Sequence, residues 1–120
     1  MSEVFIHIHS GPDLKNKVTL GLLVAVHAEK NGHDVKVFLA ADGVHILNCK
    51  KKDEVVGEGT GDLQDHLDAL KSANTKFFVS RLSANGRGYD ESLLEGYNAE
   101  FARPEDLIRL SLEADTVLCY

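Results

Sequence analysis

The stretch VKVFLAADGV, residues 35–44, decides the fold together with FFVSRLSANGRG, residues 77–88. Each begins with a short apolar run that is typical of a buried strand, and each continues into a polar loop that contains glycine. In open parallel sheets, ligands bind beyond the carboxyl ends of the strands. The two loops, residues 40–44 and 80–88, are therefore expected to meet at one edge of a parallel sheet and to form the site.

Apolar runs alternate with amphipathic stretches along the rest of the chain. Strands separated by helix-length connections indicate an α/β fold, a parallel sheet with both faces covered by helices. The predicted strands are residues 3–9, 35–39, 76–80 and 116–120, with a fifth short strand near 99–102. The predicted helices are residues 13–31, 43–49, 62–73, 91–96 and 104–114.

Length and charge narrow the class of protein. With 120 residues, 43% of them hydrophobic, the chain fits one domain, residues 1–120. Its 13 basic and 19 acidic residues give a net charge of -6, which disfavours binding to nucleic acid or to an anionic membrane. The longest uncharged run, residues 18–28, is too short to span a bilayer, and residues 1–5 lack the basic start of a secretory signal, so a cytoplasmic location is expected.

The two cysteines, Cys49 and Cys119, form no CxxC motif and are expected to be free thiols. Cys119 alternates with Val117 on the last strand, so we expect it to face the core as a small hydrophobic residue. Cys49 follows a short helix and precedes three lysines, residues 50–52, whose positive charges favour a thiolate. Cys49 is the weak candidate for a reactive thiol, although a structural cysteine is the favoured interpretation.

The histidine pair His7 and His9 raises the question of a metal site. Both lie on the same face of the first predicted strand, and such a pair can bind zinc. Further ligands would have to come from His45, His66, Cys49 or an acidic residue, none of which has a recognisable spacing. We therefore expect no metal site, and we expect His9, at the end of the strand, to line a pocket.

Two glycine-containing turns resemble ligand loops. The cluster GEGTG, residues 57–61, lacks a preceding strand, and Asp62 already places an anion at the next helix start, so a flexible surface loop is predicted. In the turn 9–13, Ser10 or Asp13 can cap the following helix, while Gly11 allows backbone amides to approach a ligand. Both functions of this turn stay open. A flavin site would require more hydroxyl residues, and no cofactor is expected.

The helix predicted over residues 13–31 is apolar over more than one stripe of its surface. Left in water, such a surface favours aggregation of a monomer. A homo-oligomer is therefore expected, with part of this helix facing another subunit.

Polar residues follow the first three predicted strands and form the candidate site. Ser80 lacks the GxSxG elbow and the partner histidine of a serine nucleophile, so hydrolase activity is disfavoured. The arginine and serine side chains around it have two interpretations of equal weight. They form either a polar pocket that holds a small anion or a solvated loop with surface ion pairs. The candidate ligand-binding residues are Ser10, Gly11, Asp42, Gly43, Ser80, Arg81, Ser83 and Arg87, with Asn85 nearby.

Four segments resemble, in their order and spacing, the DsrE/DsrF-like family. They are VFIHIHSGPD (4–13), GHDVKVFLAADGV (32–44), KFFVSRLSANGRG (76–88) and EADTVLCY (113–120). The resemblance implies a three-layer α/β/α domain around a five-stranded parallel sheet, assembled as trimers or hexamers. It also implies that members active in sulfur relay carry a reactive cysteine at the end of the third strand, where this chain has Ser80.

A serine at that position changes the expected chemistry. A persulfide carrier needs a thiolate, and a serine hydroxyl neither forms S–S bonds nor ionises near neutral pH. Two classes of function stay open. The first is a relative of sulfur-relay proteins that does not transfer sulfur at residue 80 and has a protein partner; the second is a non-catalytic oligomeric module that binds a small ligand or anion.

Overall fold

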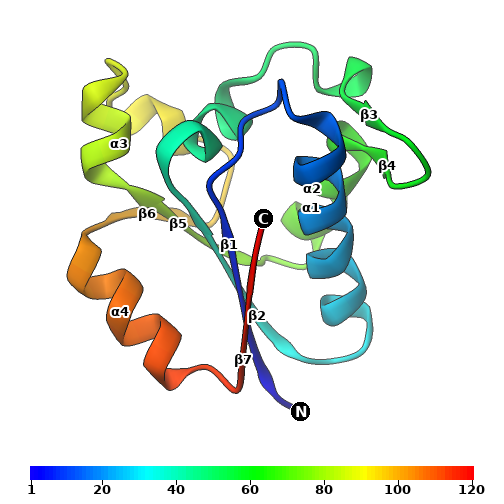
Figure 1. Ribbon diagram of the computed structural model, residues 1–120, viewed down its shortest axis with the longest axis vertical. Coiled ribbons are helices and arrows are strands. Elements are labelled where there is room, and N and C mark those ends of the chain that lie inside the picture. Colours follow the sequence, from blue (N-terminus) through cyan, green and yellow to red (C-terminus); the bar gives the residue numbers. More distant parts are fainter.

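The structure, a computed structural model, describes residues 1–120 and is built around one parallel sheet (Figure 1). All neighbouring strands of this sheet run parallel, in the order β6-β5-β2-β1-β7. The predicted α/β class and the fifth short strand are confirmed. The strands are β1 (Glu3–Ile8), β2 (Asp34–Leu39), β5 (Lys76–Ser80), β6 (Ala99–Ala102) and β7 (Thr116–Cys119).

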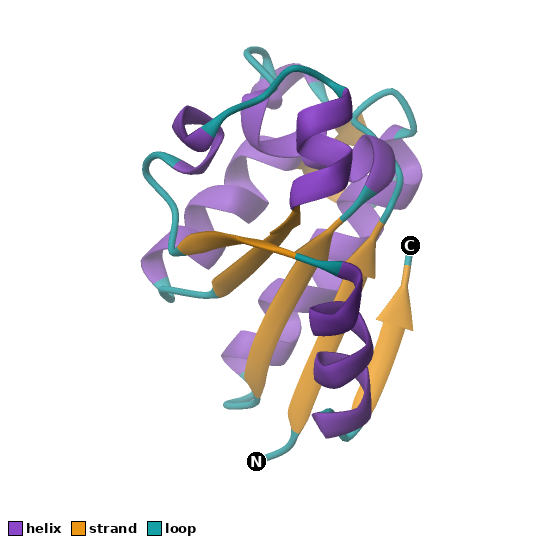
Figure 2. Ribbon diagram, turned by 90° about the vertical axis from the view of Figure 1, so that its left-hand side faces the viewer, coloured by secondary structure: helices purple, strands orange, loops and turns teal.

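Helices cover the two faces unequally. Helices α1 and α2 lie side by side on one face, while α4 alone packs on the other, and the short α3 directly follows β5 (Figures 1 and 2). Three 3-10 helices lie in the connections. The helices are α1 (Lys15–Lys30), α2 (Leu63–Ser72), α3 (Arg81–Gly86) and α4 (Pro104–Glu113), with η1 (Ala41–Asn48), η2 (Lys52–Glu54) and η3 (Glu91–Leu94).

The strand order explains this inequality. From β1 through β2 and β5 to β6, each connection moves in the same direction across the sheet. Only the connection from β6 to β7 returns, passing to the far side of β1. Because crossovers between parallel strands are right-handed, helices of the outward and return connections lie on opposite faces. The return contains one helix, so α4 covers its face alone.

The larger core lies between the sheet and the helices α1 and α2. Alternate strand residues such as Ile6, Val37 and Phe77 point to this side and are fully buried against Leu22 and Leu67. Burial of each such side chain contributes about 1.5–3 kcal/mol to stability. The apolar positions of the two helices are thus used mainly to cover the sheet.

The smaller core on the other face is a row of aromatic rings. Phe5, Phe38 and Phe78 come from three neighbouring strands, and Leu110 of α4 packs over them. The Phe5 and Phe38 centroids are 6.1 Å apart, and those of Phe38 and Phe78 are 6.4 Å apart. The α4 helix covers this row and leaves the end of the sheet near the C-terminus open (Figure 2).

Three local predictions were wrong. The predicted loop 81–86 is the helix α3, and the predicted flexible loop 57–61 is part of a hairpin formed by β3 (Val56–Gly57) and β4 (Gly61–Asp62). This hairpin is fixed to α1 because Gly57 is buried against Thr19, whose hydroxyl hydrogen-bonds that of Thr60 at 2.7 Å. The third concerns the start of α1, where Leu14 is the N-cap without a side-chain hydrogen bond, so neither Ser10 nor Asp13 caps it.

The two short predicted helices are present in a tighter form than an α-helix. The short helices predicted at 43–49 and 91–96 are 3-10 helices, at Ala41–Asn48 and Glu91–Leu94. No helix has both the length and the apolar character that crossing a membrane requires.

The contact between Gly43 and β1 offers a test of this fold. A Cβ atom at Gly43 would lie 2.3 Å from the backbone oxygen of Ile8, so Gly43→Ala must displace backbone atoms. We expect it to lower the free energy of unfolding by about 3 kcal/mol, the upper end of typical overpacking costs. Urea denaturation measures this value.

The matched control is Gly86→Ala, at the end of α3. No atom lies within 4 Å of a Cβ built there, so the change should stay within about 0.5 kcal/mol of wild type. Equal stability of the Gly43→Ala and wild-type proteins would contradict the close approach of the loop after β2 to β1.

Candidate functional site

The loops after β1, β2 and β5 meet at the carboxyl edge of the sheet. All three strands are parallel, so their carboxyl ends share one edge. The first two loops are in contact, since a Cβ built at Gly11 would be 3.1 Å from the Asp42 backbone oxygen. The second and third are joined by hydrogen bonds from Arg87 to Asp42 and from Ala41 to Ser83. The candidate residues of the three loops therefore form one continuous cluster, apart from Arg81.

Ser80 occupies a structural position at the start of α3. It is the N-cap of this helix, and its Oγ accepts a hydrogen bond from the Ser83 N–H at 3.1 Å. A cap of this kind stabilises a helix by about 1 kcal/mol. The hydroxyl thus has a structural role at the position where the family resemblance implies a cysteine.

Arg87 is held in an ion pair. Its guanidinium donates to Asp42 Oδ1 at 2.8 Å and to the Ser83 backbone oxygen at 3.1 Å. The hydrogen bond from Arg87 holds the pKa of Asp42 below its usual value. An anion that binds here must compete with this carboxylate for the guanidinium.

Arg81 lies apart from this cluster. Its guanidinium stacks over the ring of Phe101 at 4.5 Å from the centroid, a cation–π contact with β6. The prediction grouped Arg81 with Arg87 because they are close in the sequence. Arg81 is the first residue of α3 and Arg87 follows its last residue, so the helix separates the two side chains.

Ala41 shows backbone strain at the same edge. Its φ of 50° lies in the left-handed region, which costs a residue with a Cβ about 1–2 kcal/mol. The Ala41 N–H donates to Ser83 Oγ at 2.9 Å, so α3 helps to hold the conformation. Strained residues of this kind cluster at functional sites, which supports the choice of this edge as the candidate site.

The candidate ligand-binding residues do not line an open cleft in a single chain. The structure has four surface hollows, and none is lined by a candidate ligand-binding residue. Ser10 is only 6% exposed and Gly43 is buried, because the loops pack directly on one another. His9, which was expected to line a pocket, is exposed at this edge and lines none of the four. The residues form a packed polar surface.

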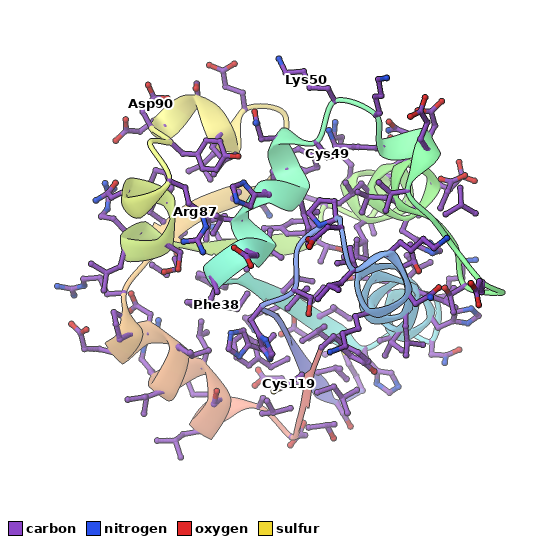
Figure 3. The ribbon with its side chains drawn as sticks, turned by 45° about the horizontal axis from the view of Figure 1, so that its top comes forward. Phe38, Cys49, Lys50, Arg87, Asp90 and Cys119 are labelled. Atoms are coloured by element: carbon purple, nitrogen blue, oxygen red, sulfur yellow. The ribbon has the colours of Figure 1, made fainter.

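The two cysteines are free, as predicted, and lie in separate parts of the molecule (Figure 3). Cys49 is half-buried against the larger core, and the nearby Lys52 ammonium donates to its backbone oxygen. Cys119 is exposed, so the prediction that it faces the core was wrong. The prediction assumes that the strand 116–120 is covered, whereas β7 is an edge strand of the sheet.

His7 and His9 lie on the α4 side of β1. Their ring centroids are 5.3 Å apart, and the His7 ring meets the Phe38 ring edge-on at 5.7 Å. His7 Nε2 is buried without a hydrogen-bond partner. Burial, and secondly the neighbouring His9, lower the pKa of His7. No group of three or more histidine, cysteine or acidic residues has an arrangement that could hold a metal ion.

A polar network that the sequence does not predict connects η1 with the segment after α3. The Tyr89 hydroxyl lies 2.6 Å from His45 Nδ1, and Asn48 Nδ2 donates to it at 3.3 Å. These residues are 41 and 44 positions from Tyr89, so no local signal links them. The network fixes η1 next to the loops of the candidate site.

The comparisons with known proteins agree with this geometry. The model of the DsrE/DsrF-like family matches residues 2–120. The chain belongs to this family. Its fold is similar to the crystal structure of the YchN protein from E. coli, with a TM-score of 0.81, 24% sequence identity and full coverage of both chains. The search of curated proteins finds no match.

The strain at Ala41 predicts an unusual effect of glycine. Ala41→Gly should raise the free energy of unfolding by about 0.5 kcal/mol. Glycine accepts a positive φ without strain, and this gain exceeds the loss that comes from the greater freedom of glycine in the unfolded chain. Thermal or urea denaturation measures the change.

The preceding residue provides the control. Ala40 has a φ of -136°, an extended conformation, so Ala40→Gly should lower stability by about 0.5–1 kcal/mol. A loss of stability in Ala41→Gly similar to that in Ala40→Gly would show that residue 41 is not strained.

Proposed function

We propose that this DsrE/DsrF-like protein is related to the sulfur-relay proteins of its family but does not transfer sulfur at residue 80. The observation that carries the proposal is the position of Ser80, at the end of β5 and at the N-terminus of α3. A hydroxyl there lacks the soft nucleophile that S–S exchange requires. On this proposal, the carboxyl edge serves to bind a protein partner or a small ligand.

The alternative is a non-catalytic module that binds a small anion. Ser83 and Arg87 lie together at the carboxyl edge, as such a site requires. The ion pair between Arg87 and Asp42 weighs against a free anion site. Anion binding would have to be accompanied by separation of this pair.

The proposal predicts that a thiol at residue 80 restores the missing chemistry. In a Cys49→Ala, Cys119→Ala background, which has no thiol, Ser80→Cys should gain one sulfur atom from a persulfide donor. Intact-mass spectrometry detects the added sulfur. Loss of the N-cap oxygen should lower stability by about 1 kcal/mol, which leaves the protein folded.

The matched control is Ser72→Cys in the same background. Ser72 is exposed at the end of α2 and gives an ordinary surface thiol. Residue 80 should load sulfur faster than residue 72. Equal or slower loading at residue 80 would count against a family site at that position.

We further propose that the protein is a homo-oligomer and that α1 takes part in the interface. An open hollow between α1 and the edge strand β7 is lined by Leu23, Val24 and Leu118, and no acidic or basic residue other than histidine lines it. Leu20, on the same helix, is 40% exposed. In a chain of net charge -6, a groove free of carboxylates allows two copies to approach.

Light scattering tests the assembly. We expect a mass that is a multiple of 13.2 kDa at micromolar concentration, and a shift towards the monomer in Leu23→Glu, which places a carboxylate in the groove. The control Asn85→Glu adds the same group on α3 and should leave the assembly intact. A monodisperse 13.2 kDa species for the wild-type protein would contradict the proposal.

A further inference from the structure

The exposed Cys119 does not stand alone. In the pairing of β1 with β7, Cys119 is the register partner of His7, just as Val117 is that of Phe5. Register partners on neighbouring parallel strands project to the same face of a sheet. Phe5 belongs to the core under α4, so His7 and Cys119 project on the α4 side, with His9 beside His7.

The course of α4 leaves this group accessible. The helix starts at Pro104, two residues after β6 ends, and stops at Glu113, three residues before β7 starts. It therefore crosses from the carboxyl end of one edge strand to the amino end of the other. The carboxyl ends of β1 and β7 stay free of it (Figure 1). Both His9 and Cys119 are exposed.

The imidazole of His7 is suited to accept a proton. Its lowered pKa keeps the ring neutral at pH 7, and a neutral imidazole has one nitrogen with a free lone pair. No protein group hydrogen-bonds the buried Nε2, the Cys119 sulfur included, so proton transfer requires the two side chains to move closer together. A base next to a thiol activates it as a nucleophile by taking its proton.

We propose that Cys119, with the His7 imidazole as its proton acceptor, is a reactive thiol that attacks the S–S bond of a persulfide or disulfide. This site is distinct from residue 80, so the inference goes beyond the function proposed above. It assigns sulfur chemistry to the edge strand β7.

The reaction balances without an oxidant. The Cys119 sulfur attacks one sulfur of the substrate R–S–S–R′, and its proton passes to His7. The new S–S bond joins Cys119 to S–R′, the old S–S bond breaks, and the leaving thiolate R–S⁻ takes the proton from His7 as R–SH. With a persulfide, R′ is hydrogen, and Cys119 carries one added sulfur.

The surroundings favour this chemistry over acyl transfer. An acyl group would need free N–H donors for the oxyanion of its tetrahedral intermediate. Two neighbouring backbone donors are used in the sheet, since the His9 N–H donates to the Tyr120 oxygen at 3.0 Å and the Tyr120 N–H donates to the His7 oxygen at 2.9 Å. Exchange at sulfur needs only the nucleophile and access to the S–S bond.

The test uses the single-thiol protein Cys49→Ala and two probes, glutathione persulfide and oxidised glutathione. Intact mass distinguishes an added sulfur atom from a glutathionyl group. At pH 7, folded Cys119 should react with at least one probe about tenfold faster than the same thiol in the urea-unfolded chain, a modest gain for a positioned base. Cys119→Ala, which retains Cys49, should lose the fast reaction.

Histidine variants separate activation from simple exposure. In the Cys49→Ala protein, His7→Phe retains an aromatic ring against Phe38 and should reduce the rate at pH 7 about tenfold, with the loss shrinking as the pH rises. The control His27→Phe changes an exposed histidine of α1, which lies on the other face, and should leave the rate unchanged.

The pH profile gives a second readout if His7→Phe disturbs folding. In the Cys49→Ala protein, the folded chain should stay reactive at lower pH than the unfolded chain does. Identical profiles for the folded and unfolded chains, or fast labelling that depends on Cys49, would overturn the proposal. Neither result would alter the test at residue 80, which uses a background without Cys119.

Discussion

The parallel pairing of all five strands is the constraint on which the rest of this structure depends. Parallel neighbours require crossover connections, and the right-handed sense of these crossovers sends α1 and α2 to one face and α4 to the other. The same pairing brings the carboxyl ends of β1, β2 and β5 to one edge. The position of the candidate site and the unequal cover of the sheet are thus two results of one topology.

The candidate site contains few free polar groups. Ser80 caps α3, Ser83 binds the Ala41 N–H, and Arg87 is paired with Asp42. Two of these bonds connect the loops after β2 and β5, which are far apart in the sequence, and one of them holds Ala41 in a strained conformation. A ligand or partner that binds Ser80, Ser83 or Arg87 would therefore have to replace hydrogen bonds that these residues already make.

At the other end of the same edge, near the ends of β1 and β7, side chains are exposed or lack a hydrogen-bond partner. Cys119 and His9 are exposed, and His7 has a nitrogen without a partner. The difference comes from the topology, because β7 is an edge strand and α4 crosses to its amino end, away from the carboxyl ends of β1 and β7. The candidate site at Ser80 and the exposed Cys119 therefore lie along one sheet edge, and the chemistry proposed at one does not require chemistry at the other.

The sequence by itself determined the parallel α/β fold, its five strands and the family, because apolar runs, helical periodicity and glycine-bearing turns are local signals. It also predicted that the loops after β1, β2 and β5 meet at one edge of the sheet. Tertiary structure alone decided that Arg81 leaves the site for Phe101, that residues 57–61 form a hairpin on α1, and that Cys119 faces solvent next to His7. Each of these features depends on which elements become neighbours in space. The alternation of Val117 and Cys119, for example, is the same on a covered strand and on an open edge, so it does not show whether Cys119 is buried.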